Sequence, residues 1–108
     1  MKIKRFNKII ERRIGKIRAI LTAKAEDYAK GADRLYTFNR GAQIIQKTPA
    51  EALDGMLIKH YISYREILDD VAAGKPIKKA RLDEKMGDLI NYLLIQEAVI
   101  LDSGLVEK

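Results

Sequence analysis

Four polar side chains run along one face of a segment that is otherwise strongly apolar. Their spacings of three and four residues put them on the same side of a helix. The rest of the segment, residues 81–101, is rich in leucine, isoleucine and valine. A charged side chain in such surroundings must be paired, hydrated or functional, so this row is the first candidate for a functional site. Its members are Lys85, Asp88, Asn91 and Tyr92.

A second polar group, Lys59 and His60, lies midway along another predicted long helix, 49–73. If the two helices pack antiparallel, as their short connection suggests, the two groups approach each other. Such a set suits a phosphorylated small molecule, because lysine and arginine bind phosphate, an amide recognises a base edge and tyrosine stacks. With three residues near the end of the first helix, the candidate binding set is Lys24, Asp27, Arg34, Lys59, His60, Lys85, Asp88, Asn91 and Tyr92.

Each of these residues also has a purely structural interpretation. His60 lies within the apolar stripe of its helix and could be a hydrogen-bonded core residue. Lys85 and Asp88 could form an ion pair within one helix. Tyr64 and Tyr92 could be core aromatics. The sequence shows no glycine-rich phosphate loop, zinc pattern, nucleophile elbow or catalytic triad that would decide between these alternatives.

Carboxylates on the two long predicted helices form a candidate magnesium site. Mg²⁺ prefers oxygen ligands, and facing helices can supply them together. The same spacing also occurs on ordinary hydrated helix faces. Asp88 and Glu84 are the proposed ligands, and the wider acidic set is Glu66, Asp69, Asp70, Glu84 and Asp88.

The composition predicts one all-α domain spanning residues 1–108. Hydrophobic residues make up 47% of the chain and charged residues 33%, with only two prolines and seven glycines, which is typical of a globular helical protein. The absence of cysteine excludes disulfides and thiolate chemistry and suits a reducing compartment. No apolar run is long enough to cross a membrane or to form a signal peptide. We therefore expect a cytoplasmic protein without a membrane partner.

The positive charge is concentrated in the first helix. Residues 1–24 contain nine lysines and arginines against one acid, whereas the rest of the chain has twelve bases and fourteen acids. The bases lie opposite an apolar stripe, so they form either a hydrated polar face or a surface for nucleic acid or an acidic protein, at residues 2–24.

Stop and start signals divide the chain into a basic N-terminal helix ending near Tyr28, a short connecting helix over 37–46, and two long antiparallel helices. The strongest local signal runs from Thr48 to Glu51, where threonine, proline and glutamate complete a capping box. Gly74 and Pro76 end the first long helix. Asp83 is a candidate cap for the second, although helical structure could begin a little earlier.

The last helix, 82–101, is apolar on nearly every side, and such a helix must be buried on nearly every side. A chain of this size covers it with difficulty. We therefore expect a homo-oligomer, most simply a two-fold symmetric dimer.

The segment E-K-M-G-D-L-I-N-Y-L-L, residues 84–94, resembles the acidic third-motif helix of MazG-like all-α nucleoside triphosphate pyrophosphohydrolases. More closely, the chain resembles the nucleotide-modification-associated helical family of phage and bacteria. The matching segments are K-A-E-D-Y (24–28), D-R-L-Y-T-F (33–38), K-H (59–60) and K-M-G-D-L-I-N-Y (85–92).

The resemblance implies a MazG-like helical scaffold, a nucleotide or derivative as ligand, and the possibility of magnesium-dependent phosphate-bond hydrolysis. Asp88 fits the final metal-ligand position of the pyrophosphohydrolases. Lys85 stands where a second carboxylate is expected, and Lys59 with His60 replaces an acidic cluster. The resemblance thus supports the fold and a nucleotide pocket better than it supports hydrolysis. The alternative function is a non-enzymatic module that binds nucleic acid or an acidic partner through the basic helix.

Overall fold

The computed structural model describes residues 1–23, 29–31 and 33–108. Over these ranges the chain forms helices and no strand, so the all-α prediction is confirmed. Lys24, Asp27 and the expected end of the first helix at Tyr28 lie outside the described residues. The helices are α1 (Ile3–Ala23), α3 (Tyr36–Ile45), α4 (Pro49–Ala72) and α5 (Lys79–Asp102).

The start of α4 is the predicted capping box. The Thr48 hydroxyl accepts a hydrogen bond from the backbone N–H of Glu51 at 3.2 Å, and the Glu51 carboxylate accepts one from the backbone N–H of Thr48 at 3.4 Å. Pro49 occupies the first helical position, where its missing N–H costs nothing. The hydrogen bond from the Thr48 side chain lowers the pKa of Glu51. Local chemistry therefore fixes this helix start.

The loop between α4 and α5 begins at Gly74, whose φ of 69° is left-handed and suits glycine. Helix α5 starts at Lys79, and its N-cap residue Lys78 makes no side-chain capping bond. Asp83 therefore does not cap α5. It lies inside the helix, where its carboxylate is available to another element.

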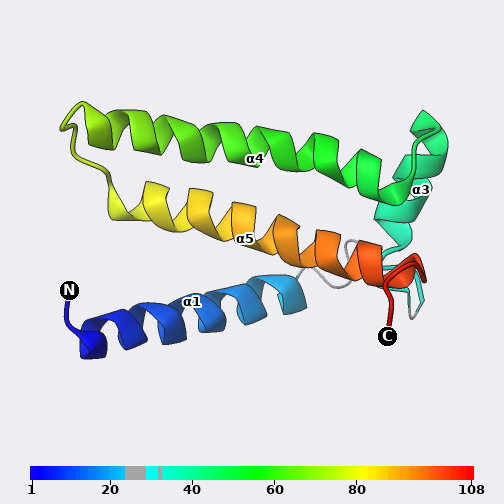
Figure 1. Cartoon of the computed structure of the whole chain (residues 1–108), viewed down its shortest axis with the longest axis horizontal. Coiled ribbons are helices and arrows are strands. Elements are labelled where there is room, and N and C mark those ends of the chain that lie inside the picture. The colour runs from blue at the N-terminus through cyan, green and yellow to red at the C-terminus, as the bar shows by residue number, and fades with distance from the viewer. Residues whose placement is uncertain (24–28, 32) are drawn as a thin grey trace.

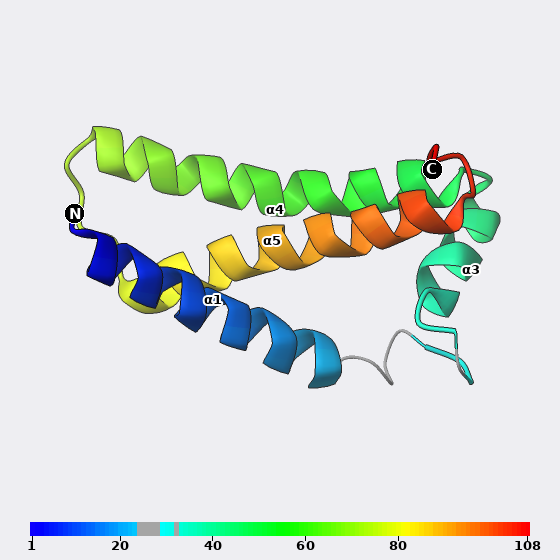
Figure 2. The ribbon, with the colours of Figure 1, turned by 60° about the horizontal axis from the view of Figure 1, so that its bottom comes forward.

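Helices α4 and α5 lie side by side over most of their length, with the loop joining them at one end of the molecule (Figures 1 and 2). Polar contacts connect them at both ends and in the middle. Following α4 from its first residue, the contacting pairs are Ala50 with Gln96, His60 with Asp88, and Asp70 with Arg81.

The hydrophobic core lies at one end of this helix pair, where α3 crosses it (Figure 1). Phe38 of α3, Leu53 of α4 and Val99 of α5 form the buried cluster, so each of the three helices supplies one side chain. Away from this end, α4 and α5 have less cover, and only a few other apolar side chains in the described part of the chain are buried.

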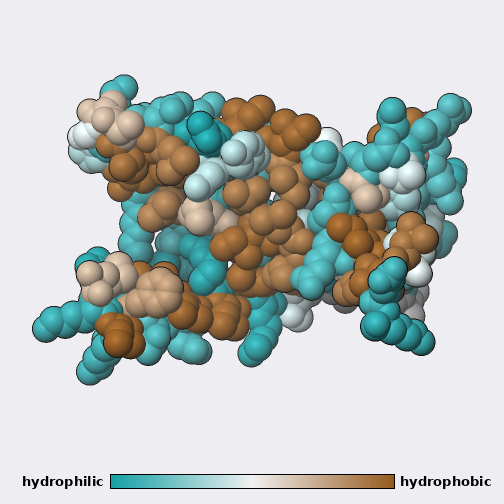
Figure 3. Space-filling view, viewed as in Figure 1, coloured by the Kyte–Doolittle hydropathy of each residue, from teal (hydrophilic) through white to brown (hydrophobic). Residues whose placement is uncertain are grey.

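The predicted inward stripe of α4 is only partly buried. Leu53 and Ile67 are buried, whereas Met56, Leu68 and Val71 are exposed. Apolar surface accordingly covers much of the face seen in Figure 3. None of the described helices has the length and apolar character needed to cross a membrane.

Helix α1 lies along α5 (Figures 1 and 2) and is held there by a cluster of charges around Asp83. Arg12 binds both carboxylate oxygens, at 2.7 and 2.5 Å, and Arg13 and Lys16 lie 3.2 and 3.5 Å from the same carboxylate. The hydrogen bond from Arg12 holds the pKa of Asp83 well below its ordinary range, and the charges of Arg12 and Lys16 act in the same direction. Part of the basic face of α1 is therefore used inside the molecule.

Replacing this carboxylate should loosen α1. We expect Asp83→Asn to accelerate hydrogen exchange across residues 3–23, because an amide cannot neutralise Arg12, Arg13 and Lys16. In the wild type the same loosening should develop in acid. A carboxylate with a lowered folded-state pKa stabilises above the ordinary aspartate value of about 4 and loses this effect as the pH falls toward the lowered value.

Glu84→Gln is the matched control, since Glu84 neighbours Asp83, has an exposed side chain and contacts Lys85 of its own helix. It removes the same charge without touching α1. Equal exchange rates of α1 in the two variants would contradict a docking role for Asp83.

Candidate functional site

His60 of α4 meets Asp88 and Tyr92 of α5 midway along the two helices. The rings of His60 and Tyr92 have their centroids 4.4 Å apart at a tilt of 31°. His60 Nδ1 lies 3.7 Å from an Asp88 carboxylate oxygen. The sequence predicts that the Lys59–His60 pair approaches the polar row of α5. In the structure His60, Asp88 and Tyr92 make this approach.

The geometry leaves the Asp88 carboxylate able to accept further hydrogen bonds. A separation of 3.7 Å allows an ion pair when His60 is protonated, but it exceeds the length of a hydrogen bond. The side chains of His60 and Asp88 are 19% and 33% exposed, so both reach solvent. Aromatic rings beside an acceptor can stack against a ligand ring while the acceptor binds the N–H groups of the ligand.

Two lysines are close to this cluster along the two helices. Lys59 precedes His60 in the chain and is exposed. Lys85, nearly one turn before Asp88 on α5, lies 3.5 Å from a carboxylate oxygen of Glu84. The observed ion pairs therefore differ from the Lys85–Asp88 pair considered in the sequence, since Lys85 contacts Glu84 of its own helix while Asp88 contacts His60 of α4. An exposed ion pair of this kind is weak, so Lys85 can release Glu84 to bind an anion.

Asn91 is the buried member of the predicted row. Its residue exposure is 6%, and its side-chain oxygen has no hydrogen-bond partner among the described residues. An unpaired acceptor in such a place carries a desolvation penalty. Gly87, one turn earlier, is also buried, and the guanidinium of Arg13 lies 3.1 Å from the position that a Cβ there would take. The absence of a side chain at Gly87 makes room for the docked helix α1.

Arg34 does not join the His60 cluster. It donates a hydrogen bond to the backbone carbonyl of Leu21 at 3.0 Å and lines a groove between α1 and α5 that also contains Ile90 and Leu94. Two residues of helix correspond to roughly 200° of turn, so Ile90 faces away from Asp88. Arg34 therefore belongs to the opposite side of α5, and Lys24 and Asp27 fall outside the described residues.

The described residues contain no group of three or more acidic, histidine or cysteine side chains placed to hold a metal ion. Asp88 contacts His60, and the side chain of Glu84 is 64% exposed and contacts Lys85. Mg²⁺ needs several oxygen ligands in near-octahedral geometry. The donor set of the described chain does not fit such an ion, so no chemical step is derived through it.

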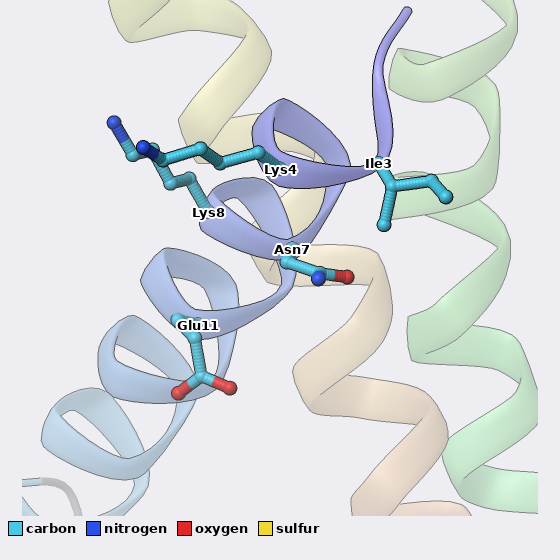
Figure 4. A pocket seen from close by; sticks show the side chains of 5 residues that line it. All are labelled: Ile3, Lys4, Asn7, Lys8 and Glu11. Atoms are coloured by element: carbon cyan, nitrogen blue, oxygen red, sulfur yellow. The ribbon is translucent and has the colours of Figure 1, made fainter.

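A shallow depression on α1 is lined by Ile3, Lys4, Asn7, Lys8 and Glu11. All five residues belong to one helix. Figure 4 shows Lys4 and Lys8 extending to the same side while Ile3 points to the other. The depression lies on the surface of a single helix. It shows that the lysines and the apolar side chain of this helix end point to different sides.

The Asp83 cluster is the main arrangement that sequence reasoning missed. Its signal was present in the adjacent arginines Arg12 and Arg13 on a helix with almost no acid of its own. A helix of that kind requires a carboxylate from elsewhere if it is to pack against the protein. Several acids in the chain could have served, and the fold selects Asp83.

Comparisons of the chain with known protein families, with characterised proteins and with solved structures return no match. The arrangement of the described residues is therefore the basis for any proposal about function.

The unpaired oxygen of Asn91 gives a direct test of whether this position is optimised for stability. We expect Asn91→Leu to raise the free energy of unfolding by about 1 kcal/mol or more, because it removes the desolvation penalty of an unpaired acceptor. Chemical denaturation measures the change. Gln43→Leu, at an exposed position of α3, should leave stability nearly unchanged. A loss of stability in Asn91→Leu would show that Asn91 is a structural residue with partners.

Proposed function

We propose that this is a small MazG-like helical protein of nucleotide metabolism or modification, and that it binds a nucleotide or a derivative where α4 and α5 meet. In this proposal the helices form the antiparallel pair of the scaffold, and the protein acts in the cytoplasm, or in the host cytoplasm if a phage encodes it. The observation that carries the proposal is the contact of His60 with both Tyr92 and Asp88, flanked by Lys59 and Lys85.

The chemistry of these side chains matches the parts of a nucleotide. The paired rings of His60 and Tyr92 offer an aromatic surface against which a base can stack. Asp88 accepts hydrogen bonds from amino or hydroxyl groups of the ligand, and the lysines attract its phosphates. Asn91 shapes the base site from beneath.

The resemblance of segments 24–28, 33–38, 59–60 and 85–92 to the nucleotide-modification-associated family supports the same ligand class. Lys85 and His60 stand where MazG-like pyrophosphohydrolases have carboxylates. These positions favour binding of the phosphates over metal-dependent hydrolysis, and if the protein is an enzyme, cleavage of a phosphate bond is the reaction to test first.

A thermal melting screen against deoxynucleoside mono-, di- and triphosphates, with and without Mg²⁺, tests the proposal. A ligand at 100 times its dissociation constant should stabilise the protein by about 2.7 kcal/mol. Lys59→Ala should reduce the shift, because it removes an exposed phosphate-binding charge without disturbing the helix contacts. Lys78→Ala, in the loop between α4 and α5, is the matched control. A panel that leaves the melting temperature unchanged would contradict the proposal.

A second candidate function is the binding of nucleic acid or an acidic protein at the end of the molecule that carries the α4–α5 loop. Figures 1 and 2 place this loop at the same end as the first residues of α1. Arg12, Arg13 and Lys16 are occupied by Asp83, so they are poor candidates for an external partner. The remaining exposed bases at this end are Lys2, Lys4, Arg5, Lys8, Lys75, Lys78 and Lys79.

Charge reversal distinguishes this candidate. Lys4→Glu with Lys8→Glu should weaken binding to duplex DNA and lower the salt slope of the affinity by roughly two, the number of phosphate contacts removed. Arg40→Glu with Lys47→Glu makes the same charge change at the opposite end and should have a small effect. DNA affinity that is unchanged by the first pair, or independent of salt, would exclude the basic end as a nucleic-acid surface.

A further inference from the structure

The chain by itself exposes far more surface than a folded monomer of its size. Its accessible area is 8361 Å², whereas a compact protein of 12.3 kDa exposes about 6,100 Å². Its radius of gyration is 16.3 Å, against about 13 Å for a typical domain of 108 residues. The excess, roughly 2,300 Å², is surface that a stable form of the protein must cover.

Much of the uncovered surface is apolar and belongs to one stripe on each of three helices. The spacings of three, four, seven or eleven residues place the members of each stripe on the same side of their helix. Figure 3 shows apolar surface spreading over α1, α5 and α4 on one face of the molecule. The exposed members are Ile3, Phe6, Ile10 and Ile14 on α1, Leu82, Leu93 and Ile100 on α5, and Tyr61 and Leu68 on α4.

We propose that this face, here called the apolar face, binds the same face of a second copy of the chain in a two-fold symmetric dimer. An excess of roughly 2,300 Å² per chain doubles to a total within the 2,000–5,000 Å² typical of obligate homodimers. Two-fold symmetry pairs a surface with itself and leaves no open surface for a third copy.

The distribution of charge permits this pairing. The chain has a net charge of +6, so two copies repel unless their bases stay away from the interface. On α1 the lysines Lys4 and Lys8 point to the side opposite Ile3 (Figure 4), and Arg12 and Lys16 are directed to the Asp83 carboxylate of α5. The apolar stripe of α1 is thereby free to meet its copy without opposing charges.

The position of the hydrophobic core also favours a second copy of the chain over a different protein that binds only part of the time. The buried cluster of Phe38, Leu53 and Val99 is confined to the end near α3, so the other end of the α4–α5 pair has little cover within one chain. Stability then depends on a partner that is present whenever the chain is made. Another copy of the chain always meets this condition.

The test is the molar mass in solution by sedimentation equilibrium over a range of micromolar concentrations. We expect twice the chain mass for the wild type. Leu93→Lys should weaken self-association at least roughly tenfold, because it places a charge within the apolar face. Ile62→Lys is the matched control, since Ile62 and Leu93 are both 52% exposed and Ile62 lies about 100° around α4 from Tyr61. Its self-association should equal that of the wild type.

A folded wild type with the mass of one chain at every concentration would overturn the proposal, as would equal dissociation of the two variants. If Leu93→Lys fails to fold, the milder Leu93→Ala decides, because it removes apolar surface from the apolar face without adding a charge. Leu93→Ala should weaken self-association more than Ile62→Ala does, and equal dissociation of these two variants would count against the proposal. The apolar face excludes His60, Asp88 and Tyr92, so this outcome is independent of the nucleotide screen.

Discussion

The ion cluster at Asp83 is the interaction on which the arrangement of the molecule depends. Helix α1 carries most of the positive charge, and a helix of like charges packs against a protein only when carboxylates neutralise it. The Asp83 carboxylate contacts three cations of α1 and offsets part of their charge. The position of α1 forms the groove that Arg34 lines and places Arg13 next to Gly87. It also aligns the apolar stripe of α1 with those of α4 and α5.

This cluster also changes the meaning of the basic helix. A run of lysines and arginines indicates a nucleic-acid surface when all of them face solvent. Here the bases of α1 divide into a group that binds α5 and a group near the N-terminus that faces outward, as Lys4 and Lys8 do (Figure 4). The outward group lies at the same end as the loop lysines, so the surface available to an anionic partner is made from two segments distant in the sequence.

The candidate nucleotide site and the apolar face use different residues of the same two helices. His60, Asp88 and Tyr92 link α4 to α5, whereas Leu93 and Tyr61 belong to the exposed stripes. Helix α5 therefore carries polar contacts to α4, ionic contacts to α1 and an uncovered apolar stripe around its circumference. This division explains how so apolar a helix holds charged residues, because its charged side chains meet an oppositely charged partner or reach solvent.

The sequence by itself determined the helical class and the element boundaries where local chemistry is strong, such as the capping box at Thr48 and the left-handed glycine at Gly74. It also indicated that His60 and the row of α5 could meet, because periodicity places them on facing sides of two connected helices. The helix boundaries depend on residues close together in the chain, and their energies are local.

Only the tertiary structure decided which acid neutralises α1, which partner Lys85 takes, and how much of the apolar stripes is covered. Sequence patterns give the face of a helix that is apolar, but they do not give its neighbours or the angle at which helices cross. Asp83 was a candidate cap in the sequence and became the anchor of another helix in the fold. The physical reason is that ion pairing and burial between distant segments depend on how the helices pack. The spacing of residues within one segment does not determine that packing.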